Sequence, residues 1–129
     1  MSKKTKFIEL KEIYEKLHSP QGCMWDREQT HETLIPYLEE EAEEFIQAVK
    51  EGDYRDIKDE LGDVLLQVMF HAQIAKKAGK FDIEDVIDNL IKKIKRRHPH
   101  VFGRVKVKNT HQIKRNWDRI KKLEKKGRR

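Results

Sequence analysis

Apolar residues recur at steps of three and four along most of the chain, which is the spacing that places side chains on one face of an α-helix. The first such segment stops near Ser19-Pro20, because proline cannot continue a helix. Residues 21–29 lack this spacing, so we expect a loop there. The apolar positions of the first helix are Phe7, Leu10, Tyr14 and Leu17.

Two long helices follow the predicted loop. The second helix is expected over residues 33–50, with Thr33 as its N-cap and Gly52 beyond its end. Asp53 can cap a third and longest helix that runs to about Lys77. Because the connection between them is short, we expect the two helices to pack side by side and antiparallel.

The C-terminal half predicts two more helices and one extended segment. The fourth helix is expected from a cap at Asp82 to a stop at Pro99, and the last helix begins near Thr110. Between them Val105 and Val107 alternate with lysines, which indicates a short extended piece. The sequence therefore predicts an all-α protein, a helical bundle of four to five helices joined by short loops.

The length of 129 residues is that of one domain, and no linker or internal repeat interrupts it. We therefore expect a single domain over 1–129, with a basic C-terminal helix and tail from about residue 104. The third helix is apolar on too many sides for a small monomeric bundle. Part of it is expected to face another subunit, which predicts a homo-oligomer.

Composition excludes several classes of protein. Charged residues make up 40% of the chain and hydrophobic residues 36%, with 6 Gly and 3 Pro, so the sequence is neither collagen-like nor Pro/Gly-rich and disordered. The densest apolar stretch, from Val64 to Phe70, is far shorter than the ~20 residues of a membrane helix. The N-terminal lysines lack the apolar core of a secretory signal. Because Cys23 is the only cysteine, we expect a cytoplasmic protein.

Charge is strongly separated along the chain, although the net charge is only +6. Residues 26–63 contain 14 acidic and 4 basic side chains, whereas residues 92–129 contain 17 basic and 2 acidic ones. This pattern fits a metal site together with an anionic ligand, or a nucleic-acid-binding helical module with a basic tail. The nucleic-acid hypothesis is the less favoured one because it leaves the acidic residues without a use.

Some of the acidic side chains fall on the helix faces that are expected to be buried. Glu41 lies within the arc of apolar residues on the second helix, and Glu44 follows one turn later at its edge. One polar line crosses the otherwise apolar third helix, and its members are Glu60, Asp63, Gln67 and His71. If the two helices pack antiparallel, Glu41 and Glu44 face Glu60 and Asp63, so four carboxylates share one pocket.

Four carboxylates in one pocket need protons or cations. Two such charges ~4 Å apart repel by about 4 kcal/mol at an effective dielectric constant near 20. An all-oxygen set of ligands suits Mg²⁺ or Mn²⁺ better than Zn²⁺. A buried acid network neutralised by Lys and Arg remains an alternative. Glu15-x-x-His18 and Glu28-x-x-His31 also have the spacing of a di-iron bundle, but both pairs lie at helix ends.

A series of motifs extends over residues 7 to 124. They are Gly22–His31, Leu34–Leu38 leading into Glu40-Glu41-x-x-Glu44, Glu60-Leu61-Gly62-Asp63, Phe70-His71-Ala72, Arg96–Gly103 and Trp117–Lys121. In their order and spacing these motifs resemble the MazG-like nucleotide pyrophosphohydrolases, within the wider all-α NTP pyrophosphatase superfamily. Two positions depart from the family pattern, since Met24 stands where proline is usual and Glu43 replaces a common aromatic residue.

The resemblance implies an enzyme that hydrolyses a nucleoside triphosphate to the monophosphate and pyrophosphate, in nucleotide-pool house-cleaning. Hydrolysis of dUTP and of phosphoribosyl-ATP are neighbouring alternatives. The resemblance to the MazG-like family also implies that the protein assembles as a homodimer or homotetramer. The implied metal ligands are Glu41, Glu44, Glu60 and Asp63.

The resemblance also suggests roles for residues outside the metal set. Glu40 is the candidate for orienting or deprotonating the attacking water, or for a fifth metal ligand. Four basic side chains are the candidates for binding phosphates, and they are Lys93, Arg96, Arg97 and Lys121. Trp25 and Trp117 offer flat surfaces for a base or sugar, although Trp117 also has the spacing of a core residue.

Overall fold

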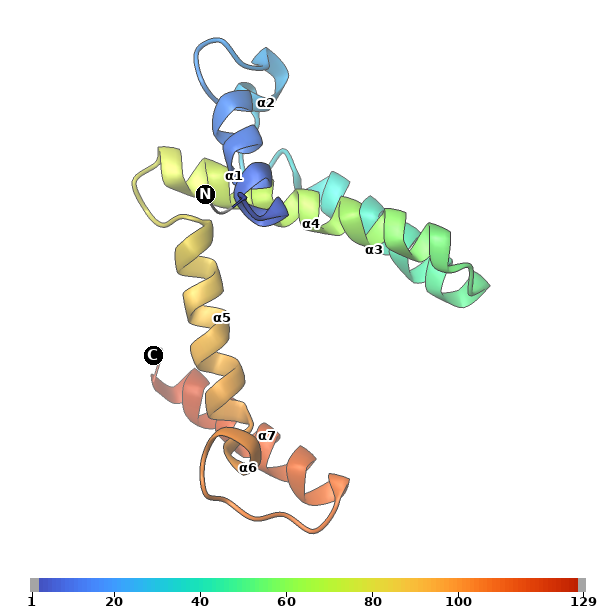
Figure 1. Ribbon diagram of the computed structural model, residues 1–129, viewed down its shortest axis with the longest axis vertical. Coiled ribbons are helices and arrows are strands. Elements are labelled where there is room, and N and C mark those ends of the chain that lie inside the picture. Colours follow the sequence, from blue (N-terminus) through green and yellow to red (C-terminus); the bar gives the residue numbers. More distant parts are fainter. Residues whose placement is uncertain (1–2, 128–129) are drawn as a thin grey trace. The chain divides into compact units, whose positions relative to one another are not determined.

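Seven helices make up the regular structure of residues 3–127, the part of the chain that this computed structural model describes (Figure 1). The predicted all-α class is confirmed. In chain order the helices are α1 Lys6–Leu17, α2 Met24–Glu28, α3 Ile35–Glu51, α4 Tyr54–Lys77, α5 Ile83–Arg97, α6 Pro99–Phe102 and α7 Thr110–Gly127. Over the same residues no helix is long and apolar enough to cross a membrane.

Contacts divide the chain into two compact units, Met1–Ile83 and Glu84–Arg129. The first contains α1 to α4, and the second contains nearly all of α5 together with α6 and α7. The expectation of one domain over the whole chain stays a prediction.

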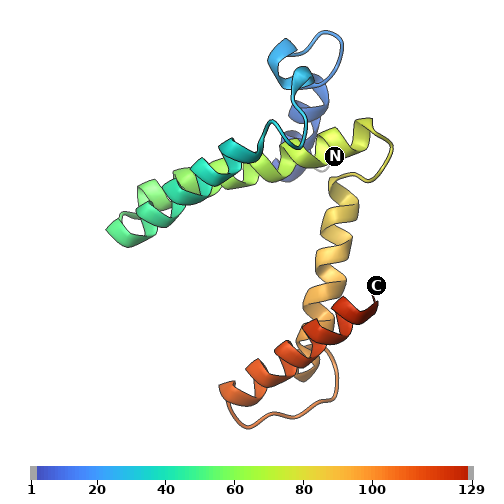
Figure 2. The same cartoon turned by 180° about the vertical axis from the view of Figure 1, so that it is seen from behind.

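The first unit is built around the α3–α4 hairpin. Both views show the two helices side by side and antiparallel, as their short connection requires (Figures 1 and 2). Helix α3 ends at Glu51 and is followed by the C-cap residue Gly52, whose φ of 79° lies in the left-handed region that favours glycine. Helix α4 begins at Tyr54, after the N-cap residue Asp53, whose side chain accepts a hydrogen bond from the Arg55 amide at 2.9 Å. This turn thus holds the two helices in the arrangement predicted from the sequence.

Helix α1 closes the apolar core of the first unit against α4. Tyr14 is buried there, and its hydroxyl donates to the Leu66 carbonyl oxygen at 3.2 Å. The Phe70 ring lies 6.1 Å from the Tyr14 ring and 5.2 Å from the buried His18 ring. Leu34, Met69 and Ala75 are almost fully enclosed, which places the core at the open end of the hairpin rather than at its turn.

Two short helices and one helix start differ from the sequence prediction. The expected loop over 21–29 contains α2, and α6 was not anticipated after Pro99. Thr33 does not cap α3, because Leu34 is the N-cap and the Thr33 hydroxyl instead bonds within the preceding turn. The segment with Val105 and Val107 forms no helix and no strand, so the short extended piece expected there stays a prediction.

Candidate metal centre

Four carboxylates from α3 and α4 come together beside the hairpin. Glu41, Glu44, Glu60 and Asp63 each offer one oxygen, and these four oxygens all lie within 4.8 Å of one another. Each helix contributes two acids three residues apart, so both side chains project from the same face. The structure therefore brings together the four acids that the sequence indicated as a set.

Mutual repulsion and partial burial favour protonation of this cluster. Removal from water raises the pKa of Glu60 to about 7, with further contributions from a hydrogen bond with Glu44 and from the charges of Glu44 and Asp63. The pKa of Glu41 is also raised, first by burial and then by repulsion from Glu44 and Asp63. A bound cation would relieve both effects by replacing the shared protons.

Two oxygen atoms of the cluster lack a hydrogen-bond partner, which bears on whether the cluster fits a metal ion. The Oε2 atoms of Glu41 and Glu60 are buried and have no hydrogen-bond partner. Unpaired buried acceptors are uncommon in native structures, and a hard cation prefers ligands of this kind. No ion pair with a lysine or arginine neutralises any of the four acids in the described chain, contrary to the alternative of a salted acid network. The residues present therefore could hold a metal.

Glu40 lies outside the cluster. Its side chain is exposed on α3, next to Glu41, and its charge adds a small contribution to the raised pKa of Glu41. The suggested role of Glu40 stays a prediction.

The polar line on α4 continues beyond the acids to a pair of histidines that the sequence did not reveal. Nδ1 of His31 and Nδ1 of His71 lie 2.8 Å apart, and the two rings are nearly parallel. Burial, followed by the charge of His31, lowers the pKa of His71. The line of polar residues on the third predicted helix included His71. Nothing in the spacing of the sequence indicated that its partner would be His31, which lies in the turn before α3.

The two Glu-x-x-His pairs considered for di-iron binding do not form a centre. Glu15 makes an ion pair with Lys76 at 2.7 Å, and His18 is buried in the aromatic core. Within residues 3–127, three or more metal-binding side chains gather only at the acidic cluster described above.

Trp25, in α2, is the one suggested substrate-contacting residue of the first unit. Its ring packs edge-on against Tyr37 at 5.8 Å and against Phe70 at 6.0 Å, while 46% of the residue remains exposed. These contacts explain why α2 forms where a loop was expected, because the tryptophan anchors the short helix to α3 and α4.

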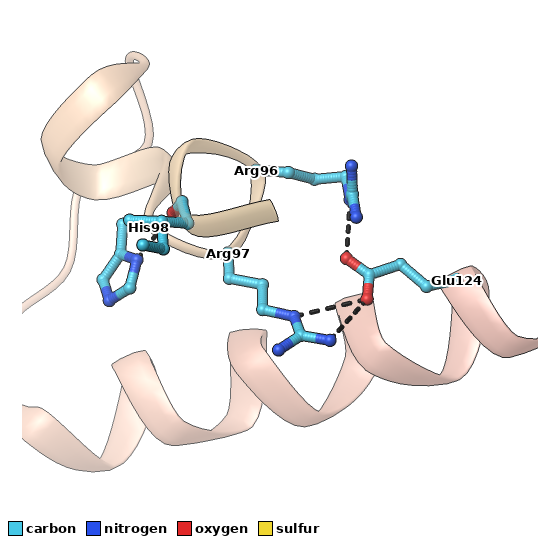
Figure 3. Close-up of polar contacts among 5 residues, drawn as sticks. Arg96, Arg97, His98 and Glu124 are labelled. Atoms are coloured by element: carbon cyan, nitrogen blue, oxygen red, sulfur yellow. Dashed lines mark hydrogen bonds and ion pairs between the residues drawn. The ribbon is translucent and has the colours of Figure 1, made fainter. Parts of the chain in front are cut away.

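The other suggested substrate-contacting residues lie in the second unit, at the end of α5 and along α7. Arg96 and Arg97 both bind Glu124 (Figure 3). The Arg97 guanidinium also lies 5.4 Å from the centre of the Trp117 ring. Lys121 is exposed on α7, whereas Lys93 is half-buried on α5. Glu124 was missed from the sequence, although it lies seven residues after Trp117 and therefore on the same face of the helix.

His98 follows these arginines and shapes the turn into α6. Its ring lies between two neighbours, with Nδ1 2.7 Å from the Ile94 carbonyl oxygen and the ring edge-on to Trp117 at 5.0 Å. A carbonyl oxygen can only accept, so Nδ1 carries the proton.

Comparisons with known proteins give a consistent result. The sequence model described as "MazG nucleotide pyrophosphohydrolase domain" matches residues 29–102. The chain is 63% identical over 97 residues to "Nucleoside triphosphate pyrophosphohydrolase/pyrophosphatase MazG" of Thermotoga maritima, covering 75% of this chain and 38% of that protein. It is 42% identical over 110 residues to "Nucleoside triphosphate pyrophosphohydrolase" of Escherichia coli K12, covering 84% of this chain and 42% of that protein.

A solved structure agrees with these sequence matches. The "Crystal structure of mazG-related protein from Thermotoga maritima" superimposes with a TM-score of 0.70 at 29% identity, covering 91% of this chain and 97% of that one. The present chain spans less than half the length of the two curated relatives.

Proposed function

The chain belongs to the MazG nucleotide pyrophosphohydrolase family, and from this we propose that it hydrolyses a nucleoside triphosphate to the monophosphate and pyrophosphate with the help of Mg²⁺ or Mn²⁺. The observation that carries the proposal is the set of four carboxylate oxygens within 4.8 Å of one another. A protein that only binds nucleic acid has no use for such a set. The same family membership supports a role in nucleotide-pool house-cleaning.

The carboxylates of α3 and α4 hold the divalent cation in this proposal, and the proposed ligands are Glu41, Glu44, Glu60 and Asp63. When bound, such a cation neutralises phosphate charge and lowers the pKa of a water molecule. Glu40 orients or deprotonates the attacking water from its exposed position next to Glu41.

Basic and aromatic side chains supply the remaining substrate contacts in this proposal. Arginine forms paired hydrogen bonds to phosphate oxygens, and lysine adds a flexible charge. The proposed phosphate contacts are Lys93, Arg96, Arg97 and Lys121, and the proposed contacts to base or sugar are Trp25 and Trp117. The exposure of Trp25 supports its proposed contact with the base or sugar, because 46% of that residue is accessible to solvent.

The test measures pyrophosphate release from a panel of canonical and damaged nucleoside triphosphates, with Mg²⁺ or with EDTA. We expect EDTA to abolish turnover and Glu41→Gln to lower kcat/KM by roughly 100-fold or more, because one of the charged ligands is lost. Glu39→Gln removes an exposed acid from the same helix and should leave turnover unchanged. Turnover that survives both EDTA and Glu41→Gln would contradict the proposed site.

A further inference from the structure

Glu124 connects two consecutive arginines of α5 to helix α7. Its Oε1 atom accepts hydrogen bonds from Nε and Nη2 of Arg97 at 3.2 and 2.7 Å, and its Oε2 atom accepts from Nε of Arg96 at 2.6 Å (Figure 3). Both oxygens of one carboxylate are thus used by two cations. These contacts lie entirely within the second unit.

The two arginines differ in their burial. The side chains of Glu124 and Arg97 are only 9% and 14% exposed, whereas that of Arg96 is 48% exposed. A buried guanidinium needs its partner, because an unpaired charge out of water is strongly destabilising. The hydrogen bond from Arg97 is the main reason that the pKa of Glu124 is lowered to about 2. The carboxylate is therefore ionised at every pH at which the protein is expected to work, and it holds Arg97 continuously.

Trp117 limits the position of the same guanidinium from another direction. The Arg97 Cζ atom lies 5.4 Å from the ring centre, and His98 packs on that ring at 5.0 Å. The carboxylate fixes one edge of the guanidinium, and the indole fixes its distance from α7. Glu124 takes two of the five N–H donors of an arginine, so the group retains donors for another acceptor.

We propose that Glu124 is a positioning residue that holds the Arg97 guanidinium beside Trp117 in the orientation in which its remaining donors bind a phosphate oxygen. The proposal rests on the proposed function, which assigns Arg97 to phosphate binding. The carboxylate reduces the positive charge near the phosphate, so it would weaken binding if it acted by charge alone. Positioning predicts the opposite result, because a guanidinium held in place loses less freedom when it binds.

The test uses the full chain with Glu124→Gln, and Asp88→Asn as the matched control. Asp88 forms an exposed ion pair with Lys92 in the same unit, so its variant removes the same charge away from Arg97. We expect Glu124→Gln to raise KM for the nucleoside triphosphate by about tenfold or more, with a smaller change in kcat. Asp88→Asn should leave both constants unchanged. Circular dichroism and thermal unfolding establish that each variant is folded.

A double-mutant cycle shows whether Glu124 acts through Arg97. In the Arg97→Gln background, the further change Glu124→Gln should not raise KM again, because its target is already absent. A second full increase of KM in that background would contradict the positioning role and indicate a general loss of structure.

Calorimetric titration with inorganic tripolyphosphate and Mg²⁺ separates this proposal from the proposed function. Glu124→Gln should bind tripolyphosphate about tenfold more weakly than the wild-type chain, whether or not any nucleotide is hydrolysed. If the wild-type chain hydrolyses no nucleoside triphosphate and this difference is still found, the proposed function fails and the positioning role stands. Equal or tighter binding by Glu124→Gln would overturn the positioning role, since the carboxylate would then be a competitor of phosphate.

Discussion

The carboxyl group of Glu60 links cation binding to pH. Its pKa of about 7 means that, without a cation, the group still carries a proton over much of the neutral range. A divalent cation needs the ionised form, so the proton must leave when the cation binds. The same desolvation and repulsion that raise this pKa make the site attractive to a cation.

We therefore predict that the affinity for Mg²⁺ rises with pH and levels off above the pKa of Glu60. Between pH 6 and pH 8 the gain should be about tenfold, because one protonated carboxyl near pKa 7 competes with the ion at the lower pH. Calorimetric titration with Mg²⁺ alone, in two buffers of different ionisation enthalpy, gives both the affinity and the number of protons released. An affinity that does not change over this range would contradict the raised pKa.

The acidic cluster could be predicted from the sequence because the spacing of residues along a helix decides which side chains share a face. Glu60 and Asp63 lie three residues apart on one helix, and a short turn was enough to bring Glu41 opposite them. The partners of His71 and Arg97 could not be predicted in the same way. His31 and Glu124 come from elements 40 and 27 residues away in the chain, and such contacts depend on tertiary packing.

Among the elements, the long helices could be predicted and the short ones could not. Helices α3 and α4 each present several turns of apolar spacing, and their shared turn carries a recognisable capping residue and glycine. Helices α2 and α6 have five and four residues, too few for a period to be recognised. Helix α2 depends instead on the contacts of Trp25 with Tyr37 and Phe70, which lie on other helices.

Two glycines of the hairpin should respond to alanine in opposite directions. Gly52 has a φ of 79°, so Gly52→Ala should destabilise the fold by about 1 kcal/mol through backbone strain. Gly62 lies inside α4, where an added Cβ meets no atom within 4 Å, so Gly62→Ala should stabilise it by roughly 0.5 to 1 kcal/mol. Urea unfolding followed by circular dichroism measures both changes. The same sign for the two variants would contradict the description of the turn.

On the scale of the whole molecule, α4 exposes more apolar surface than an isolated chain needs. Leu61, Leu65 and Val68 follow one another at steps of four and three, which places them on one stripe. They are 52%, 45% and 41% exposed. The acids of α4 project from another side of the helix, so this stripe can be covered without closing the candidate metal centre. The sequence indicated the excess of apolar residues but not which ones the chain itself would cover.

We predict that a second copy of the chain covers this stripe, in a homodimer or homotetramer. Leu65→Glu introduces a charge at its centre, which is costly to bury, so the variant should shift the assembly to monomers at micromolar concentration. Lys77→Glu changes the charge of the same helix more strongly but lies away from the stripe, so its assembly should match that of the wild-type chain. Sedimentation velocity over a range of concentrations measures the mass of each species. A wild-type chain that sediments as a monomer, or a Leu65→Glu variant that keeps the wild-type mass, would show that the exposed leucines of α4 do not hold the subunits together.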